Sequence, residues 1–381
     1  MGIGFARRDV SRRTVWCVAC CIALSSLWLI ACDASDTTTA PRLAQWSIGA
    51  EPLTSVSDDD ASGEPQLGEV AGLTRLPNGS LLVADRTLQS LRFFDADGTP
   101  TRVVGREGDG PGEFRYIAWA RRCGDSLFVE EISRRQIMVY ALDGTLARTA
   151  SDTELQGGRP AYHSACNPDG VWVHNGWESS EYERAGRARF AVPYWLASSA
   201  GNRLAELGEL PGSERLVIRY DDEFGSGPHP LGKEPVVAIG RERAYVGLAD
   251  SFAVRVFALD GTPLGALRTA DGDLRTTPAD IVRFKRLDTL GQPPARRAQL
   301  VREWDLVEFP TTVPAYDQLL VDARDHLWVR RYPRGDDASV EWIVFAPEVT
   351  GLQVRLPPPT LQHATQRPRL LPHVMQQRID R

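Results

Sequence analysis

The clearest pattern along the chain is a series of short runs in which apolar and polar residues alternate, separated by turns rich in Asp, Asn and Gly. Such alternation predicts half-buried β-strands, and Asn-Gly or Asp-Gly pairs between two runs predict hairpins. The first group has strands at 70–76, 80–84, 90–94 and 99–104, with turns at Pro77-Asn-Gly79 and Asp95-Ala-Asp-Gly98. The folded part of the chain is therefore expected to start with four consecutive strands.

This unit recurs. Later copies are predicted at 116–150, 161–196, 235–268 and 318–356, and the turns at Gly98 and Gly144 have the spacing of one four-stranded propeller blade. At one position of the second strand the copies carry a large apolar residue: Leu82, Phe128, Trp172, Tyr245 and Trp328. We interpret these side chains as packing between blades and not as a platform for a ligand.

The stretch 276–310 interrupts the β pattern. Thr277-Pro-Ala-Asp280 combines a capping hydroxyl, a Pro at the first helical position and an acid in the first turn, which predicts a helix start. A second helix is predicted over 295–307 from apolar residues on one face. We interpret this helical insertion as a flap over a blade edge; a lid over a binding face is the alternative.

The N-terminal residues carry a different pattern. Four arginines precede an apolar run from 15 to 31, which is typical of a secretory signal. The run ends in Leu29-Ile-Ala-Cys32, which resembles a bacterial lipobox and implies that Cys32 is lipidated and begins the mature protein. We expect a signal peptide at 1–31, a tether at 32–44, and an exported chain anchored by lipid to the bacterial cell envelope, facing the periplasm or the exterior. A simple membrane-anchoring helix is the alternative.

Two cysteines remain in the folded part. Cys123 and Cys166 both follow the first strand of their blade, so they occupy equivalent places in neighbouring blades near the axis. In an oxidising compartment this placement predicts a disulfide, with two free thiols as the alternative.

The stretch Gly105-Arg-Glu-Gly-Asp-Gly-Pro-Gly-Glu-Phe114, placed after Phe93-Phe-Asp-Ala-Asp-Gly98, resembles the linker between blades of NHL-type propellers. It is most similar to the lipoprotein propellers of this fold in bacteria, and the resemblance spans about 67–347. It implies an all-β, six-bladed β-propeller, here at 45–356, with the helical insertion at 276–310. Members of that family are mostly binding scaffolds, so the resemblance informs fold more than function.

The end of the predicted propeller is irregular. Pro357-Pro-Pro359 stops the last strand, and 351–381 contain five Arg, one Asp and no Glu. We interpret 357–381 as a divergent tail that is foreign to the fold and the last blade as incomplete; a tail after a five-bladed ring is the alternative. A short strand near Trp46 is expected to be the outer strand of the last blade.

Composition limits the chemistry. The net charge of −6 over 381 residues argues against a nucleic-acid partner. The six His lack metal-ligand spacing, and neither a Gly-x-Ser-x-Gly elbow nor a phosphate-binding loop is present. We therefore assign no catalytic and no metal residues and expect no cofactor. Calcium is left open, because Asp85, Glu130, Glu131, Asn175 and Asp250 could converge near the axis.

The ends of the second strands gather on one face of a propeller. We predict a candidate ligand-binding ring there, formed by Asp85, Arg86, Glu131, His174, Asp250 and Arg331. A ring of both signs suits an unknown protein or a polar small molecule, and solvated strand ends are the alternative. Charge reversal at Asp85 and Glu131 is expected to abolish binding without lowering stability.

The sequence thus favours an exported, membrane-tethered propeller that is a non-catalytic binding module for a protein or small ligand. The membrane is contacted through the lipid anchor only. A metal-assisted hydrolase or lyase that uses carboxylates around the axis is the alternative.

Overall fold

A computed structural model describes residues 45–46, 54, 56, 67–177, 182, 184–220, 223–305, 307–335, 340–347 and 352–356. The chain divides into two units, Met1–Arg42 and Leu43–Arg381, and all described residues belong to the second. The predicted signal peptide, the tether with Cys32, and the tail at 357–381 lie outside the described residues.

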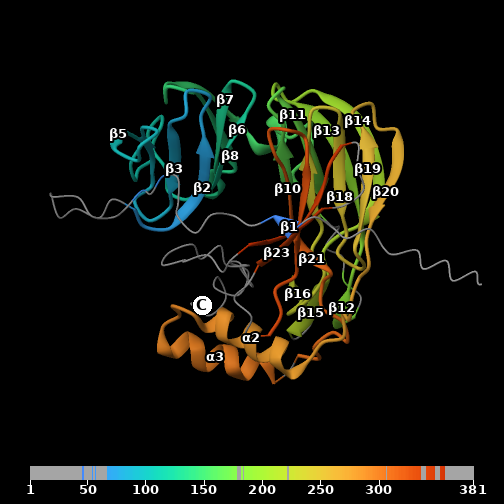
Figure 1. Cartoon of the computed structure of the whole chain (residues 1–381). Coiled ribbons are helices and arrows are strands. Elements are labelled where there is room, and N and C mark those ends of the chain that lie inside the picture. The colour runs from blue at the N-terminus through green and yellow to red at the C-terminus, as the bar shows by residue number, and fades with distance from the viewer. Residues whose placement is uncertain are drawn as a thin grey trace, which may run out of the picture. The chain divides into compact units, whose positions relative to one another are not determined.

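The described residues form antiparallel sheets in which consecutive strands are neighbours, as expected for an all-β propeller (Figure 1). Sheet 1 contains β2 (Val70–Arg75), β3 (Leu81–Asp85), β4 (Ser90–Phe94) and β5 (Pro100–Val104). Sheet 2 contains β6 (Ile117–Cys123), β7 (Ser126–Glu131), β8 (Gln136–Ala141) and β9 (Leu146–Ser151). A 3₁₀ turn, η1 (Ile132–Arg134), follows β7, and a short helix, α1 (Asp152–Leu155), follows β9.

The next three sheets repeat the plan. Sheet 3 contains β10 (Ala161–Cys166), β11 (Val171–Gly176), β13 (Ala191–Ser198) and β14 (Arg203–Pro211). Sheet 4 contains β17 (Val236–Ile239), β18 (Arg243–Gly247), β19 (Ala253–Ala258) and β20 (Pro263–Arg268). Sheet 5 contains β21 (Tyr316–Val321), β22 (Leu327–Arg331), β23 (Val340–Phe345) and β24 (Leu352–Leu356), and β1 (Gln45–Trp46) pairs in parallel with β24.

The repeat extends to the register of the strands. In four of the sheets the first strand has an irregularity directly after its first residue, between Val70 and Gly72, Ile117 and Trp119, Ala161 and His163, and Tyr316 and Gln318. A bulge at a fixed place re-aims the side chains that follow it. The first strands of these sheets therefore present equivalent positions to the axis.

The hairpin glycines explain the turn signals in the sequence. Gly98 and Gly144 have φ of 90° and 84°, a left-handed conformation that other residues avoid. A Cβ at Gly144 would lie 3.0 Å from the Phe93 ring, which belongs to sheet 1. Gly144 therefore serves the turn in sheet 2 and its packing on the neighbouring sheet.

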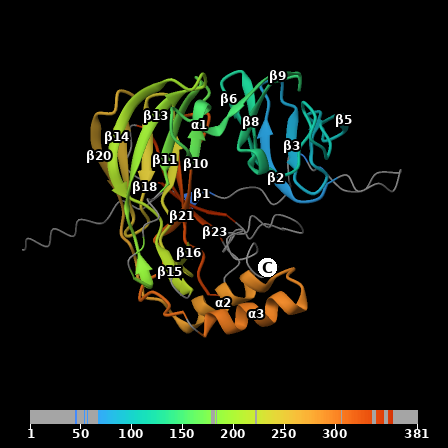
Figure 2. The ribbon, with the colours of Figure 1, turned by 180° about the vertical axis from the view of Figure 1, so that it is seen from behind.

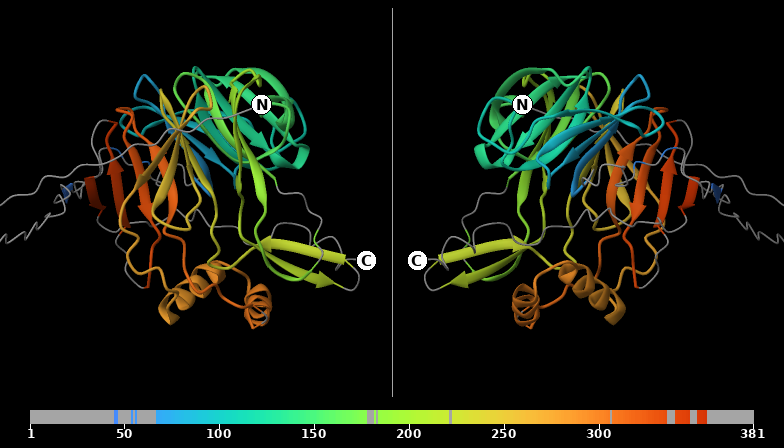
Figure 3. Two further views of the ribbon diagram at one scale, coloured as in Figure 1. Left: turned by 90° about the vertical axis from the view of Figure 1, so that its right-hand side faces the viewer. Right: turned by 90° about the vertical axis from the view of Figure 1, so that its left-hand side faces the viewer.

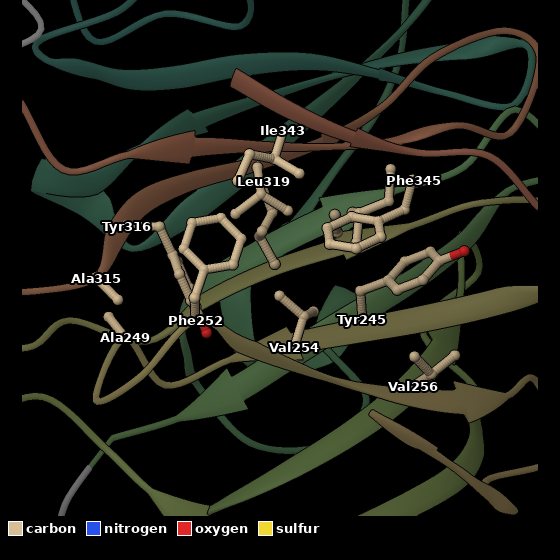
Figure 4. Close-up of a cluster of buried hydrophobic side chains, with 13 residues drawn as sticks. Tyr245, Ala249, Phe252, Val254, Val256, Ala315, Tyr316, Leu319, Ile343 and Phe345 are labelled. Atoms are coloured by element: carbon tan, nitrogen blue, oxygen red, sulfur yellow. The ribbon is translucent and has the colours of Figure 1, made fainter. Parts of the chain in front are cut away.

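Hydrophobic clusters join successive sheets. Sheets 1 and 2 share a cluster that includes Leu82 and Phe114, the last residue of the glycine-rich linker. Sheets 2 and 3 share one with Phe128 and Trp172. A further cluster lies between sheets 3 and 4, and another, with Tyr245, lies between sheets 4 and 5 (Figure 4). The prediction that Leu82, Phe128, Trp172 and Tyr245 pack between blades is therefore confirmed.

The predicted number of six blades is not confirmed. The described residues form five propeller-type sheets, and among them no hydrophobic cluster joins sheet 5 to sheet 1. The fifth cluster, which contains Trp342 and Val344 with Trp328 and Val340 against it, comes from sheet 5 alone. The strand near Trp46 does lie at the outer edge of the last sheet, as expected, but that sheet is the fifth.

Two insertions lie at one end of the sheets. A three-stranded insertion sheet contains β12 (Gly186–Ala188), β15 (Arg215–Tyr220) and β16 (Glu223–Pro228), and the helical insertion contains α2 (Pro278–Thr289) and α3 (Pro294–Trp304). These segments follow either a second or a fourth strand, and in an up-and-down sheet both strands finish at the same end. Figures 2 and 3 show both insertions projecting from that end.

The helical insertion is where the sequence predicts it. Thr277 and Asp280 form a reciprocal capping box at the start of α2, with Pro278 in the first turn. Between the two helices, the rings of Phe284 and Trp304 lie 6.4 Å apart, and Lys285 lies over Trp304. No helix in the described part of the chain is both long and apolar enough to cross a membrane.

Candidate functional site

An axial cavity of about 280 Å³ lies where the first strands of all five sheets finish. Its lining residues are Leu73 and Thr74 from β2, Ala120, Arg121 and Arg122 from β6, Ala165 and Cys166 from β10, Ala238 and Ile239 from β17, and Leu319, Leu320 and Val321 from β21. All of these residues lie in the C-terminal halves of their strands, so the cavity is at the end of the sheets opposite to the two insertions.

Most of the lining residues are apolar, but polar atoms make up the larger part of the accessible wall, and its charged groups are all cationic. Arg121 and Arg122 are the two ionisable side chains that line it, and Thr74 adds one hydroxyl. The Nε atom of Arg122 donates a hydrogen bond to the carbonyl of Gly124 at 2.9 Å. The cavity therefore has a wall of mixed polarity with an excess of positive charge.

Arg121 differs from the other arginines near the axis. Its guanidinium lies 5.4 Å from the ring centroid of Trp119, two residues earlier on β6. The residue is exposed, and the protein packed around the base of its side chain lowers the pKa of the guanidinium, while the charge of Glu130 acts in the opposite sense. No carboxylate or carbonyl oxygen of the described residues accepts a hydrogen bond from it, and none forms an ion pair with it.

Beside Arg121, two ionisable groups have strongly shifted pKa values. Burial, together with the charge of Asp152, raises the pKa of Glu130 to about 7. Burial, together with the charges of Arg203 and Arg121, lowers the pKa of His174 to about 3, so this imidazole is neutral near pH 7. Shifted pKa values are typical of functional sites, although they also occur in structural clusters, and neither Glu130 nor His174 lines the cavity.

His174 lies inside the interface between sheets 2 and 3. Its Nδ1 atom and the Ser164 hydroxyl are 2.7 Å apart, and its ring stacks on Trp172 with centroids 5.7 Å apart. Only 1% of the residue is exposed, and its Nε2 atom has no hydrogen-bond partner among the described atoms. This environment gives His174 a packing role and leaves its ring out of reach of a ligand in the cavity.

A disulfide joins sheets 2 and 3 at the ends of their first strands. Cys123 at the end of β6 and Cys166 at the end of β10 are joined, with Cα atoms 5.4 Å apart. This is the pair predicted from the sequence. Because Cys166 also lines the cavity, the bond fixes two adjacent parts of the cavity wall to one another.

The ring predicted from the strand ends lies at the opposite end, and two of its carboxylates hold backbone in place. Both Asp85 and Glu131 are fully buried. Asp85 accepts hydrogen bonds from the amides of Gly68 and Leu88, at 2.6 and 2.9 Å. Glu131 accepts from the Tyr116 amide at 2.9 Å and from the η1 amides. Each carboxylate thus ties the start of a first strand to the turn after a second strand.

This environment corrects one expectation. Charge reversal at Asp85 and Glu131 was expected to leave stability unchanged, but a buried carboxylate that satisfies backbone donors cannot be reversed at low cost. Loss of ligand binding in such a variant would therefore not distinguish a binding role from unfolding. Whether the ring binds a ligand stays a prediction.

The remaining ring residues have varied surroundings. Arg86 donates to the carbonyls of Ile117 and Ala118, at 2.8 and 2.6 Å, and so joins sheet 1 to sheet 2. Arg331 lies 4.8 Å from the Phe252 ring centroid and 3.2 Å from a Glu341 oxygen. These contacts also join neighbouring elements.

The six ring residues do not all occupy equivalent positions in their sheets. Strand pairing makes Asp85, Glu131 and Arg331 equivalent, because each is opposite the first residue of its first strand. In sheets 3 and 4 this position is Gly176 and Gly247, while His174 lies two residues earlier and Asp250 three residues later. Asp250 is exposed and pairs with Arg189 at 2.6 Å. The structure therefore does not bring the six residues together into a single set.

The part of the chain that the structure describes contains no group of three His, Cys, Asp or Glu side chains placed to hold a metal. Sequence reasoning missed the axial cavity and its arginines. The available signal was Ala-Arg-Arg-Cys123 at the end of a predicted first strand, where a charged residue would have to face either the axis or the neighbouring sheet.

No protein-family model matches this chain, and no curated protein matches it in sequence. Among solved structures, it is similar to a candidate exported protein from Bacteroides fragilis, with 10% identity over 81% of this chain and 79% of that one and a TM-score of 0.43. It is also similar to virginiamycin B lyase from Staphylococcus aureus (11% identity, 75% and 69% coverage, TM-score 0.34). Regucalcin from Agrobacterium tumefaciens, a calcium-binding protein, is a further neighbour (9% identity, 82% and 80% coverage, TM-score 0.33). At these values the similarities carry no argument about function.

Proposed function

We propose that this chain is an exported, membrane-tethered β-propeller that acts as a non-catalytic binding module for a small ligand. The observation that carries the proposal is the axial cavity, because residues from the first strands of all five sheets line it. A cavity of about 280 Å³ is near the lower end of the range for small-molecule sites, which are mostly apolar with a few convergent polar groups.

The cavity is also accessible. Leu73 and Leu320 both line it, and they remain 65% and 37% exposed, respectively. Large aliphatic side chains so exposed at the wall of a concave site are suited to contact an apolar part of a ligand. Their positions on β2 and β21 put them on the first and fifth sheets.

The alternative, a metal-assisted hydrolase or lyase, has less support. It would use carboxylates at the strand ends, and Asp85 and Glu131 direct their oxygens at backbone amides instead. Glu130, with its raised pKa, is the carboxyl group that best favours this alternative, and it does not line the cavity.

The binding proposal can be tested by thermal-shift screening of a small-molecule collection against the full-length protein in detergent. Leu73→Trp and Leu320→Trp enlarge exposed side chains at the wall and should narrow the cavity without overpacking the core. We expect compounds that raise the Tm of the wild type and fail to raise the Tm of either variant. Stabilising compounds that act equally on all three proteins would contradict the proposal.

Tethering has a separate test. Cys32→Ser removes the proposed lipid acceptor, so it should release the protein from membranes or block its processing. Fractionation identical to the wild type would contradict the lipid anchor and leave the cavity proposal unaffected.

A further inference from the structure

We propose that the helical insertion docks on an anionic lipid surface through the exposed faces of α2 and α3. The sequence predicts that the lipid anchor alone contacts the membrane, so this docking is a second contact. It does not involve the axial cavity. Exposed aliphatic side chains and exposed arginines are concentrated on this one element, and both features suit a lipid surface.

The first feature is the group of exposed aliphatic side chains. Eleven large apolar residues in the described part of the chain are exposed, and four of them fall within 282–301. These four are Val282, Leu287, Leu290 and Val301, which are 61%, 40%, 51% and 50% exposed. Single exposed aliphatic residues are normal on a protein surface, whereas a group of them marks an interaction site.

The exposed residues of each helix share one outer face, because they recur every three or four positions. They include Val282, Arg286 and Leu290 along α2 and its C-terminal cap, and Arg297, Val301 and Arg302 along α3. The other side of α3 carries the buried residues Leu300 and Trp304, and the Trp304 ring contacts Phe284 of α2. The helix pair therefore packs through its aromatic side and presents aliphatic and arginine side chains to solvent.

The second feature is the charge of the insertion. Six basic and three acidic residues lie between Pro278 and Trp304, in a chain whose net charge is −6. All three acids have partners within the fold, and none of them is exposed. Asp280 pairs with Arg334, Asp288 accepts a hydrogen bond from the Trp304 indole, and Glu303 pairs with Arg296. The negative charges of the insertion are thus offset by neighbouring groups.

The exposed charges of the two helices are arginines. Arg286, Arg297 and Arg302 are exposed, and Arg297 and Arg302 have no acidic partner among the described residues. Asp305, directly after α3, is also exposed and offsets part of this charge. The outer face keeps a positive excess, opposite in sign to the chain as a whole.

Arginines interleaved with aliphatic residues suit a lipid headgroup region. Guanidinium groups can reach lipid phosphates while the aliphatic side chains enter the boundary with the acyl chains. Each basic residue close to an anionic leaflet adds to the attraction. A nucleic acid would satisfy the charge but leave the four aliphatic side chains in water, so anionic lipid is the better partner.

The length of the tether is compatible with this docking. In sheet 5, β1 lies at one edge, where the tether joins, and β21, which follows α3, lies at the other. Four strand spacings separate the two edges by about 19 Å. The thirteen residues of 32–44 span up to about 45 Å when extended. The chain is therefore long enough for the anchor and the insertion to reach the same bilayer.

Thiol labelling tests the docking on the full-length protein reconstituted in vesicles. Val301→Cys places a reporter on the outer face of α3, and Leu204→Cys places the control on β14, because both residues are 50% exposed. Labelling by a membrane-impermeant maleimide would be followed by mass spectrometry of the labelled peptide, in phosphatidylcholine vesicles with and without phosphatidylglycerol. We expect phosphatidylglycerol to slow the labelling of Val301→Cys about tenfold and that of Leu204→Cys less than about twofold.

Salt and charge reversal test the electrostatic part. Labelling of Val301→Cys should become fast again at about 1 M salt, where the Debye length falls to about 3 Å. It should also become fast when Arg297→Glu and Arg302→Glu are added together. The matched control is Arg255→Glu with Arg268→Glu, at exposed positions on β19 and β20, which should leave the slow labelling unchanged.

Two outcomes would overturn the inference. Slow labelling of Val301→Cys in both kinds of vesicle, unaffected by reversal of the two arginines, would show that a protein surface or a second copy covers the face. Labelling of Val301→Cys as fast as that of Leu204→Cys in both kinds of vesicle would show that nothing covers it. Neither outcome bears on the axial cavity, which the thermal-shift screen tests. The lipid anchor is tested separately by fractionation of Cys32→Ser after a salt wash, which removes electrostatic contacts.

Discussion

Arg334 and Asp280 form an ion pair, with Nη2 and Oδ2 2.7 Å apart, that ties the loop after β22 to the first turn of α2. The Asp280 side chain is 1% exposed and also accepts hydrogen bonds from the Thr277 amide and hydroxyl. Burial acts to raise the pKa of this carboxyl, but the hydrogen bonds from Arg334 and Thr277 outweigh burial and lower the pKa to about 2.

Asp280→Ala should therefore detach the helical insertion. The variant loses a helix cap and leaves Arg334 without its partner, which together should destabilise the protein by about 3 kcal/mol. Denaturant unfolding measures this loss, and limited proteolysis should show new cleavage within 276–310. Asp305→Ala, at an exposed residue after α3, is the control. Equal stability and equal cleavage of the two variants would show that the ion pair does not hold the insertion.

The sequence predicted the start of α2 because capping is local: Thr277 and Asp280 are three residues apart, and the motif needs nothing else. Arg334 could not be predicted as the partner, since no pattern links a residue of the insertion to a loop 54 residues later. Local signals thus predict where an element begins, and tertiary structure decides where it docks.

The same limit explains the errors in the candidate site. Asp85 and Glu131 were recognised as equivalent strand ends, and the strand register confirms that equivalence. Their burial was missed because the amides that they accept from, at Gly68 and Tyr116, precede a different strand. β14 was missed as well, since most of it is exposed and the alternation is weak there.

Glu130 predicts a pH dependence of stability. Its folded pKa of about 7 is above the value of 4.5 for an unperturbed Glu, so the folded state retains this proton longer than the unfolded state does. Stability from this group is complete below about pH 4.5 and is lost as pH rises towards 7. Charged Arg121 and Asp152 and the Trp119 hydrogen bond are the groups that act on it.

Glu130→Gln should remove this loss. Because one pKa unit is worth about 1.4 kcal/mol, the variant should be more stable than the wild type at pH 8 by on the order of 2–3 kcal/mol. At pH 4.5 the two proteins should be nearly equal. Denaturant unfolding at several pH values measures the difference, with Glu242→Gln at an exposed position as the control. A constant difference between Glu130→Gln and the wild type at all pH values would contradict the assignment.

The disulfide should be a major contributor to stability. It closes a loop of 43 residues, for which the chain-entropy estimate gives about 3–4 kcal/mol. Replacement of Cys123 and Cys166 together by Ala should lower the stability by about this amount, and a reductant should lower the wild type to the level of the double variant without affecting that variant. A mass map that shows both thiols free in exported protein would refute the bond.

The C-terminal tail should contribute little to the fold. The outer edge of β24 is already covered, because β1 pairs with it in parallel, so the last sheet does not need a further strand to protect its edge. Deletion of 358–381 should therefore leave the Tm nearly unchanged.

Trp46→Pro is the contrasting variant: it removes a backbone donor from β1 and should lower the Tm, since Pro cannot take part in the ladder. An opposing possibility rests on Trp328, Val340, Trp342 and Val344. They form a cluster in sheet 5 that is buried at Trp342 and Val344 and that no described residue of another sheet joins. If the deletion lowered the Tm as much as Trp46→Pro does, the tail would belong to the fold, and hydrogen exchange at Trp342 and Val344 would show whether it packs on that cluster.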